Sequence, residues 1–339
     1  MTVALETKII AHPGLAYEEQ DIVRVQVSGS AWRIPVVFNR RKRVMIRMLG
    51  SVMNATPQDL ESPVFQYRVT PFLADPRNRR SVIVTINGVT YRLSKKTRAN
   101  GKFVGWIDVP MPAMQKASLS GLPLNYTVGF DDDSAQPAEN RIHLLKQVGT
   151  SVVTDIDDTI KDSLVNDRRE LLANTFLRNF RPVEGMVEVY NEWSDRGASF
   201  HYVSSSPWQL YEPLETMIDE FGFPLGTMHL RNFRLRDQFL KKLLLIRQKG
   251  KASAIKALMK KMPGRNFVLV GDSGERDAKI YRKICEKFPG RVKGVFIRNL
   301  EGRPFKESQQ EKLKLSLPNG ICSSFKFAEE LAAKARPLF

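Results

Sequence analysis

The second half of the chain contains four short runs of almost uninterrupted apolar residues, and these runs constrain its fold more than any other feature. Such runs are typical of strands that are buried on both faces of a parallel sheet. Amphipathic segments with helical spacing separate them, and the alternation predicts a doubly wound α/β domain. The runs are Val152–Thr154, Phe200–Val203, Phe267–Val270 and Val295–Ile297, and the amphipathic segments are Glu184–Arg196, Pro207–Phe221 and Asp277–Phe288.

The N-terminal part of the chain has a different pattern. Its short alternating runs are separated by turn residues and show no helical period, which favours a sandwich or barrel; we predict a sandwich-like all-β domain. Its clearest element is a hairpin in which Asn87-Gly88 joins Ser81–Ile86 to Val89–Leu93, because this dipeptide tolerates a type I′ turn. Further strands are predicted at Ile22–Val27, Trp32–Phe38, Val44–Met48, Val64–Thr70, Phe103–Val109 and Tyr126–Phe130.

Two domains are expected from the length of 339 residues, since a domain commonly takes about 100–200. The stretch Asp131–Glu139 is acidic, rich in small residues and contains a proline, which suits an exposed connection. The predicted organisation is a β-rich domain over residues 1–130, a linker over 131–148 and an α/β domain over 149–339.

The charge balance favours an anionic partner. Lys and Arg number 53 against 36 Asp and Glu, giving a net charge of +17, which suits nucleic acid or an anionic membrane. The excess is spread over both halves, so a dedicated nucleic-acid module is not required. Basic clusters are expected in turns of the β-rich domain, where they could bind anions or simply be solvated. They are Arg40–Arg43, Arg77–Arg80 and Lys95-Lys96.

Membrane-span and secretory-signal patterns and the number of cysteines restrict the class of protein further. No apolar run reaches the roughly 18 residues of a membrane span, and Met1–Gly14 lacks the pattern of a secretory signal. A cytoplasmic protein is therefore expected, with peripheral membrane binding as an open alternative. Two cysteines, Cys285 and Cys322, are too few for a disulfide framework or a four-ligand zinc site.

Polar residues follow three of the predicted parallel strands. The first runs into Asp155-Ile156-Asp157-Asp158-Thr159, the second into Ser204–Ser206, and the third into Gly271-Asp272, with Asp277 shortly after. Lys251 begins the helical run Ala252–Met259 before the third strand. Ligands bind beyond the carboxyl ends of such strands, so these side chains are expected to converge on one site.

The residue types at this site suit phosphomonoester hydrolysis. Asp155 can attack phosphorus to give an aspartyl-phosphate, and Asp157 can protonate the leaving oxygen and then activate water. Ser204 and Lys251 can hold the phosphoryl oxygens. An oxygen cage suited to Mg²⁺ is expected from Asp155, the Asp157 backbone carbonyl and Asp272.

Other polar residues near these motifs are expected to have structural roles. Asp158 is expected to cap a turn, Ser206 to be the N-cap of a helix that begins at Pro207, and Gly274 to form the turn that returns Asp277 to the site. His201 lies in the middle of a buried strand and is expected to be a core histidine. The role of Ser205 stays open.

The motifs carry a resemblance. Asp155-x-Asp157-x-Thr159, Ser204, Lys251 and Gly271-Asp272-x-x-x-x-Asp277 resemble motifs I to IV of the haloacid dehalogenase superfamily, in that order, with Thr159 and Asp277 as supporting residues. More specifically, TDIDDTIKDS (154–163), HYVSSSPWQLY (201–211) and FVLVGDSGERD (267–277) are similar to the actin-patch-associated phosphatidate phosphatases, which are distantly related to the lipins.

The resemblance implies a Rossmann-like phosphatase domain that removes phosphate from phosphatidate with Mg²⁺ and yields diacylglycerol. It covers about residues 150–300 and is weaker in the β-rich region. One departure is Ala278-Lys279, where family members commonly carry Pro-Glu. This change leaves the catalytic positions intact but puts surface contacts carried over from relatives in doubt.

Two alternatives to a phosphatidate phosphatase stay open. The same site could act on another bulky phosphomonoester, of a phosphoprotein or a nucleic acid, or the chain could be a non-catalytic adaptor for anionic lipid or actin-associated partners. Binding to a phosphatidate-containing membrane is expected to be mainly electrostatic, with no apolar anchor and with a contribution from Arg40–Arg43. No stable nucleic-acid partner is expected, and the oligomeric state is left open.

Overall fold

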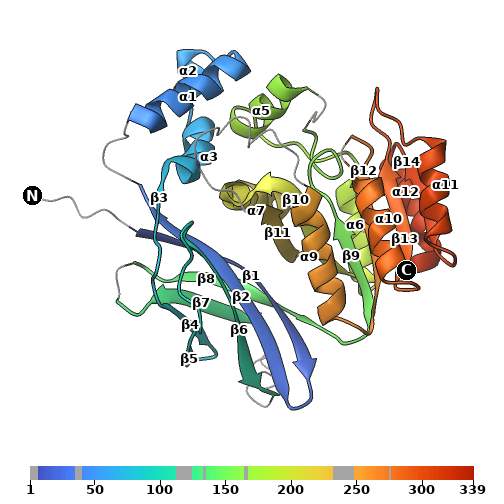
Figure 1. The fold of residues 1–339 in the computed structure, drawn as a ribbon, viewed down its shortest axis with the longest axis horizontal. Coiled ribbons are helices and arrows are strands. Elements are labelled where there is room, and N and C mark those ends of the chain that lie inside the picture. The colour runs from blue at the N-terminus through green and yellow to red at the C-terminus, as the bar shows by residue number, and fades with distance from the viewer. Residues whose placement is uncertain are drawn as a thin grey trace, which may run out of the picture. The chain divides into compact units, whose positions relative to one another are not determined.

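The computed structural model describes residues 7–34, 40–111, 124–132, 135–163, 167–231, 248–274 and 276–339 (Figure 1). The chain forms two compact units. The first consists of residues 1–43 and 70–147, and the second of residues 44–69 and 148–339. We call them the β-rich unit and the α/β unit.

The α/β unit is built on a six-stranded sheet in which every neighbouring pair is parallel. Its order is β11-β10-β9-β12-β13-β14, so the chain moves outward from β9 and then starts again beside it with β12. This is the doubly wound order, whose switch point lies between β9 and β12. The strands are β9 (Gly149–Thr154), β10 (Ser199–Pro207), β11 (Gly226–Arg231), β12 (Arg265–Asp272), β13 (Val292–Arg298) and β14 (Ile321–Phe325).

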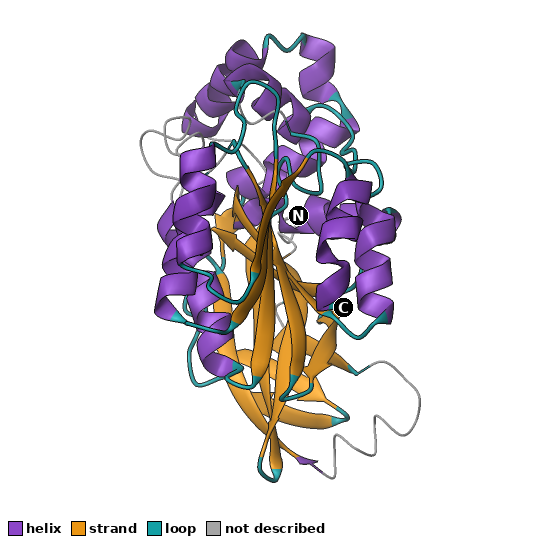
Figure 2. Cartoon of the chain, turned by 90° about the vertical axis from the view of Figure 1, so that its right-hand side faces the viewer, coloured by secondary structure: helices purple, strands orange, loops and turns teal. Residues whose placement is uncertain are grey.

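Helices flank this sheet on both sides (Figure 2). Each buries an apolar stripe: α6 (Met186–Asp195), for example, buries Met186, Val189, Tyr190 and Trp193. The predicted α/β class, the four strands and the helical segments are confirmed. The other helices after β9 are α5 (Arg168–Phe176), η1 (Trp208–Leu210), α7 (Tyr211–Glu220), α9 (Gln248–Lys261), α10 (Asp277–Lys287), α11 (Glu307–Leu315), α12 (Ala328–Ala335) and η2 (Arg336–Leu338).

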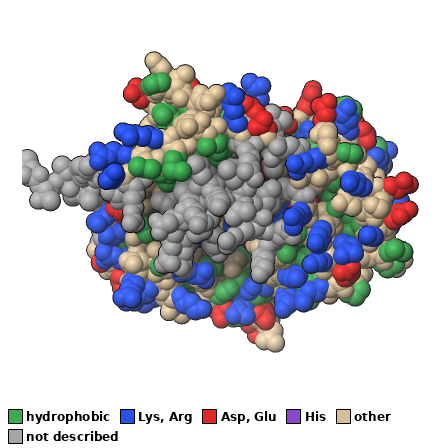
Figure 3. Space-filling model, turned by 45° about the horizontal axis from the view of Figure 1, so that its top comes forward, with side chains coloured by type: hydrophobic (Ala, Val, Ile, Leu, Met, Phe, Trp, Pro, Cys, Tyr) green, Lys and Arg blue, Asp and Glu red, His purple; other side chains and the backbone are tan. Residues whose placement is uncertain are grey.

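Basic side chains are spread over the face shown in Figure 3 and lie among acidic and apolar ones. A single large basic patch is not seen on the described part of that face.

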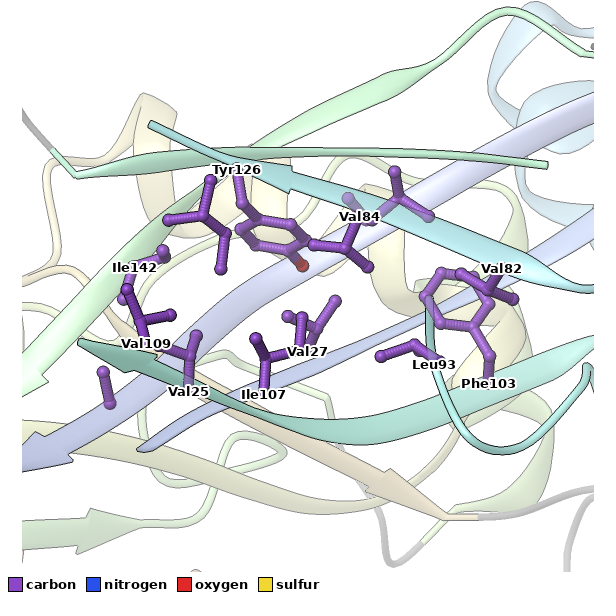
Figure 4. Close-up of a cluster of buried hydrophobic side chains, with 14 of the residues drawn as sticks. Val25, Val27, Val82, Val84, Leu93, Phe103, Ile107, Val109, Tyr126 and Ile142 are labelled. Carbon is purple, nitrogen blue, oxygen red and sulfur yellow. The ribbon is translucent and has the colours of Figure 1, made fainter. Parts of the chain in front are cut away.

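The β-rich unit is a strongly curled sheet of order β3-β2-β1-β8-β7-β4-β5, with β6 paired to β2. Apolar side chains of its strands share one core, in which Val25 and Ile107 face Val84 and Tyr126 (Figure 4). This agrees with the predicted β-rich N-terminal domain. The strands are β1 (Thr7–Glu19), β2 (Ile22–Arg33), β3 (Asp75–Pro76), β4 (Val82–Ile86), β5 (Val89–Arg92), β6 (Lys102–Pro110), β7 (Asn125–Phe130) and β8 (Ala138–Leu145).

The predicted hairpin is present. Strands β4 and β5 pair antiparallel with Ile86 opposite Val89, and the turn between them places Asn87 at φ 50° and Gly88 at φ 76°. Positive φ angles at both central residues are the mark of the type I′ turn, so the dipeptide determines the turn as expected.

Two predicted strands are wrong. Val44–Met48 lies within α1 (Arg40–Met53) and Val64–Thr70 within α3 (Pro63–Leu73), with α2 (Pro57–Glu61) between them. In α1 the buried residues Met45, Leu49 and Met53 recur every four positions, which is the period of a helix face, but a run of five residues is too short to show it. This helical insertion from the β-rich half also contributes residues 44–69 to the α/β unit, so domain 1–130 is not continuous.

The predicted linker is also different in the structure. Residues 138–145 form β8, which pairs with β1 and β7 inside the β-rich sheet; charged residues on its exposed face conceal the strand in the sequence. The basic cluster Arg40–Arg43 begins α1 and does not form a turn of the β-rich domain. In the predicted strand Trp32–Phe38, Trp32 and Arg33 belong to β2, and residues 35–38 lie outside the described residues.

Candidate active site

The carboxyl ends of β9, β10 and β12 bring the predicted polar residues together. Asp155 follows β9 directly and its backbone N–H donates to the Val270 carbonyl of β12 at 2.9 Å. Asp272 ends β12, Ser204 lies near the end of β10, and Lys251 lies in α9. All these side chains are buried. The site therefore lies at the switch point, where an open α/β sheet provides its crevice.

Lys251 lies between two carboxylates. Its Nζ is 2.9 Å from Asp155 Oδ1 and 2.6 Å from Asp277 Oδ1. All three side chains are at most 2% exposed, so the charges interact through little water and are strongly coupled. The ammonium of Lys251 offsets the cost of burying the carboxylates of Asp155 and Asp277.

Three buried carboxylates form a candidate metal centre. One oxygen each of Asp155, Asp272 and Asp277 lies within 4.8 Å of the others. An all-oxygen donor set suits Mg²⁺, and three carboxylates facing one ammonium leave negative charge that a divalent cation would balance. The residues fit the predicted Mg²⁺ in kind. Asp277 joins Asp155 and Asp272 as a possible ligand, beyond the supporting role expected for it.

Close backbone packing holds this centre together. A Cβ placed on Gly271 would lie 2.3 Å from Asp277 Oδ2 and 2.8 Å from the Tyr281 hydroxyl, so only glycine allows α10 to approach the end of β12. The Gly274 N–H donates to Asp272 Oδ1 at 2.6 Å, which fits the predicted turn. Thr159 Oγ1 donates to Asp155 Oδ2 at 3.4 Å.

Asp157 occupies a separate cluster on the same turn. Its carboxylate pairs with Lys161 Nζ at 2.8 Å and accepts from the hydroxyls of Ser163 at 2.9 Å, Ser204 at 3.0 Å and Ser206 at 2.8 Å. Burial by itself would raise the pKa of Asp157, but the ion pair with Lys161 and the hydrogen bonds outweigh it and hold the pKa well below its usual value. Asp157 is therefore ionised in this arrangement.

Ser204, the residue predicted to hold phosphoryl oxygens at the end of β10, has in Asp157 a hydrogen-bond partner that the sequence does not suggest. Ser204 donates to Asp157 and accepts the Ser206 N–H at 2.9 Å. The predicted N-cap role of Ser206 is wrong, because β10 continues through Pro207 before η1 begins. An extended backbone at Ser206 turns its hydroxyl toward Asp157.

Lys161 and Ser163 belong to the site but were missed in the sequence. Both follow the Asp155–Thr159 motif within a few residues, and both are buried. Spacing gives one signal for Lys161, since it stands four residues after Asp157 and could reach back to it. A lysine and a serine in a polar turn are otherwise indistinguishable from solvated residues.

The structural readings of Asp158 and His201 agree with the structure. Asp158 has φ 56° and accepts the Ser163 N–H at 2.6 Å, so it shapes the turn. His201 is 1% exposed and its two ring nitrogens lie 2.7 Å from Thr227 Oγ1 and 3.3 Å from Ser151 Oγ. Both belong to the framework around the site.

The strand order and the Asp155-x-Asp157 turn after its central strand define an α/β domain of the haloacid dehalogenase phosphatase fold. Residues 150–299 match the family model described as phosphatidate phosphatase APP1, catalytic domain. This segment contains all the predicted site residues, so the site lies within the part of the chain that is similar to the APP1 catalytic domain.

Two curated relatives extend this comparison. The chain is 30% identical over 212 residues to an uncharacterized protein of Schizosaccharomyces pombe, covering 60% of this chain and 34% of that protein. It is 27% identical over 250 residues to phosphatidate phosphatase APP1 of Saccharomyces cerevisiae, covering 70% of this chain and 41% of that protein. The chain thus spans well under half the length of these relatives. Among solved structures, apo phosphoserine phosphatase matches with a TM-score of 0.36 and 13% identity, over 54% of this chain and 97% of its own.

Proposed function

We propose that the protein is a Mg²⁺-dependent phosphatidate phosphatase that hydrolyses phosphatidate to diacylglycerol and phosphate through an aspartyl-phosphate at Asp155. The observation that carries this proposal is the pair Asp155 and Asp157 on one turn, with Lys251 at 2.9 Å from the first and the Asp155, Asp272, Asp277 carboxylates beside it. The match to the APP1 catalytic domain supports the choice of substrate.

In the first step an oxygen of Asp155 attacks phosphorus. The bond from Asp155 to phosphorus forms while the bond from phosphorus to the glycerol oxygen breaks, and Asp157 gives its proton to that oxygen. Asp157 is ionised in the structure and must first take up a proton. The negative charge of a phosphate bound nearby raises its pKa and favours that uptake.

In the second step water attacks the aspartyl-phosphate. Asp157, ionised again, accepts a proton from the water, the phosphorus–oxygen bond to Asp155 breaks, and phosphate leaves. The hydrogen bonds from Ser204 and Ser206 keep the Asp157 carboxylate on the turn where it can act in both steps. Lys251 offsets charge that develops next to Asp155.

The carboxylates of Asp155, Asp272 and Asp277 would hold Mg²⁺, with the Asp157 backbone carbonyl as the further ligand expected from the sequence. When bound, the ion would neutralise charge shared by the nucleophile and the phosphoryl oxygens. This charge compensation matters most in a site from which water is largely excluded.

An anionic membrane containing phosphatidate is the partner that this function requires. Within the described residues, the helices are all too short or too polar to cross a bilayer. We therefore propose peripheral binding at a membrane surface, supported by the net charge of +17.

The test is phosphate release from phosphatidate vesicles, a phosphopeptide and a 3′-phosphorylated oligonucleotide, each with Mg²⁺ and with EDTA. We expect Mg²⁺-dependent release from the vesicles at a rate well above that from the other two. Faster release from the peptide or the oligonucleotide would keep the phosphatase chemistry and overturn the lipid substrate. No release from any of the three, with a folded protein, would overturn catalysis and favour the adaptor.

A further inference from the structure

Helix α1 has two different apolar faces. Met45, Leu49 and Met53 are buried against the protein. Val44, Met48 and Val52 are also four residues apart, yet they are 43%, 49% and 37% exposed. They form a second row along the helix that no described part of the chain covers.

A basic row runs beside this exposed apolar row. Arg40, Arg43 and Arg47 follow helical spacing and are all exposed. The neighbouring Lys42 is different, because it is buried and pairs with Asp75 at 2.7 Å. In Figure 3, blue and green side chains adjoin at the upper left, where α1 and α2 lie. The solvent side of α1 is therefore half apolar and half cationic, as in helices that lie in a membrane interface.

Helix α3, which follows α1 and α2, fastens this insertion to the α/β unit. Arg68 is 6% exposed and donates to the backbone carbonyl of Thr175 at 3.0 Å, at the end of α5. The rings of Phe65 and Phe176 pack edge to face with centroids 6.5 Å apart. Burial removes water from the Arg68 guanidinium and lowers its pKa to about 10. Its hydrogen bond to the Thr175 carbonyl offsets this loss and attaches α3 to α5 (Figure 1).

The same attachment reaches the catalytic turn. Arg68 lies over the Phe180 ring at 3.7 Å, and Lys161 Nζ lies over that ring at 4.8 Å. Lys161 in turn pairs with Asp157. The helical insertion therefore rests on the chain segment that follows the catalytic turn, at the carboxyl edge of the sheet.

We propose that α1 is the membrane-docking element of this protein, which inserts Val44, Met48 and Val52 into an anionic lipid surface while Arg40, Arg43 and Arg47 bind the headgroups. Charge selects the occupant: three arginines beside the apolar row match an anionic lipid surface better than a neutral protein surface. The proposal rests on the proposed function only for the choice of phosphatidate as the anionic lipid. It also provides the apolar anchor that was not expected from the sequence.

The first test measures binding alone, by co-sedimentation with phosphatidylcholine vesicles that contain phosphatidate. We expect Val44→Ser, Met48→Ser and Val52→Ser together to weaken binding about tenfold or more, since the three side chains lose their transfer into lipid. The matched control replaces two exposed apolar residues of α11 and the segment before α12, Leu315→Ser and Phe327→Ser, and should bind as the wild type does.

The second test separates insertion from charge. Arg40→Gln, Arg43→Gln and Arg47→Gln together should weaken vesicle binding, and the equal removal of three exposed charges from α10, by Lys279→Gln, Lys283→Gln and Lys287→Gln, should weaken it much less. A fluorophore on Met48→Cys, in a Cys322→Ser background, should shift to the blue with vesicles. The same label on Leu315→Cys should not.

The outcomes of these tests decide whether the partner of α1 is an anionic lipid surface or an acidic protein. Wild-type binding by the apolar triple variant, or no spectral shift at Met48→Cys, overturns the insertion. Failure of the wild type to bind phosphatidate vesicles overturns the lipid partner and favours an acidic protein. Turnover of p-nitrophenyl phosphate should be unchanged in both α1 variants. If vesicles bind through α1 but phosphatidate is not hydrolysed, the proposed function fails and the docking surface stands.

Discussion

The Nζ atom of Lys251 lies 2.9 Å from Oδ1 of Asp155, and both side chains are almost completely buried. Asp277 approaches the same ammonium at 2.6 Å. The lysine therefore stabilises a buried carboxylate that would otherwise be costly, and in the proposed mechanism that carboxylate is the nucleophile. Stability and chemistry are linked through one ion pair.

Asp155→Asn should abolish turnover on every phosphomonoester, because an amide cannot form the aspartyl-phosphate. Phosphate release under saturating substrate measures this. The matched control is Asp158→Asn on the same turn, where asparagine keeps the acceptor oxygen for Ser163 and tolerates φ 56°. The control should retain most of its activity, and turnover near the wild-type rate in Asp155→Asn would contradict the nucleophile.

Asp157→Asn should slow alkyl phosphates more than aryl phosphates, since an aryl oxygen leaves without much protonation. The ratio of kcat values for a glycerol phosphate and p-nitrophenyl phosphate measures the difference. Equal losses on both substrates would show that Asp157 does not act as the acid in the first step.

Lys251→Met should reduce the free energy of unfolding by about 3–5 kcal/mol, because two buried carboxylates lose their counter-charge. Adding Asp277→Asn should recover part of that loss, since one of the two carboxylates that paired with the lysine then carries no charge. Urea unfolding without metal gives both values. Strictly additive losses in the double variant would mean that the Lys251–Asp277 pair is not coupled.

Acid should remove the contribution of Asp157 to stability. Its pKa in the folded protein lies below the usual value, so the unfolded chain takes up the proton first. The stabilisation is present above the usual pKa near 4 and is lost as the pH falls toward the lower folded pKa. The unfolding free energy of the wild type should therefore fall more steeply between pH 5 and about pH 2.5 than that of Asp157→Asn. Parallel curves would refute this.

The sequence alone predicted the parts of the protein that depend on short-range pattern. The runs ending at Thr154 and Val270 became neighbouring strands, because short apolar runs are typical of strands that are buried on both faces of a parallel sheet. The positions of Asp155 and Asp272 after predicted strands were sufficient to predict that these two side chains lie close together. The Asn87-Gly88 turn was determined by its own two residues.

The tertiary structure decided what depends on partners distant in the chain. Val44–Met48 is helical because a helix buries Met45 and Leu49 on the same face. A five-residue apolar run is too short to show this helical period in the sequence. Ser206 serves Asp157 because β10 stays extended past it, and Lys161 is a site residue because Phe180 and Asp157 enclose it. A sequence shows which side chains have hydrogen-bonding and ionic capacity. Only packing decides which of them share one buried volume, where unpaired charge is costly.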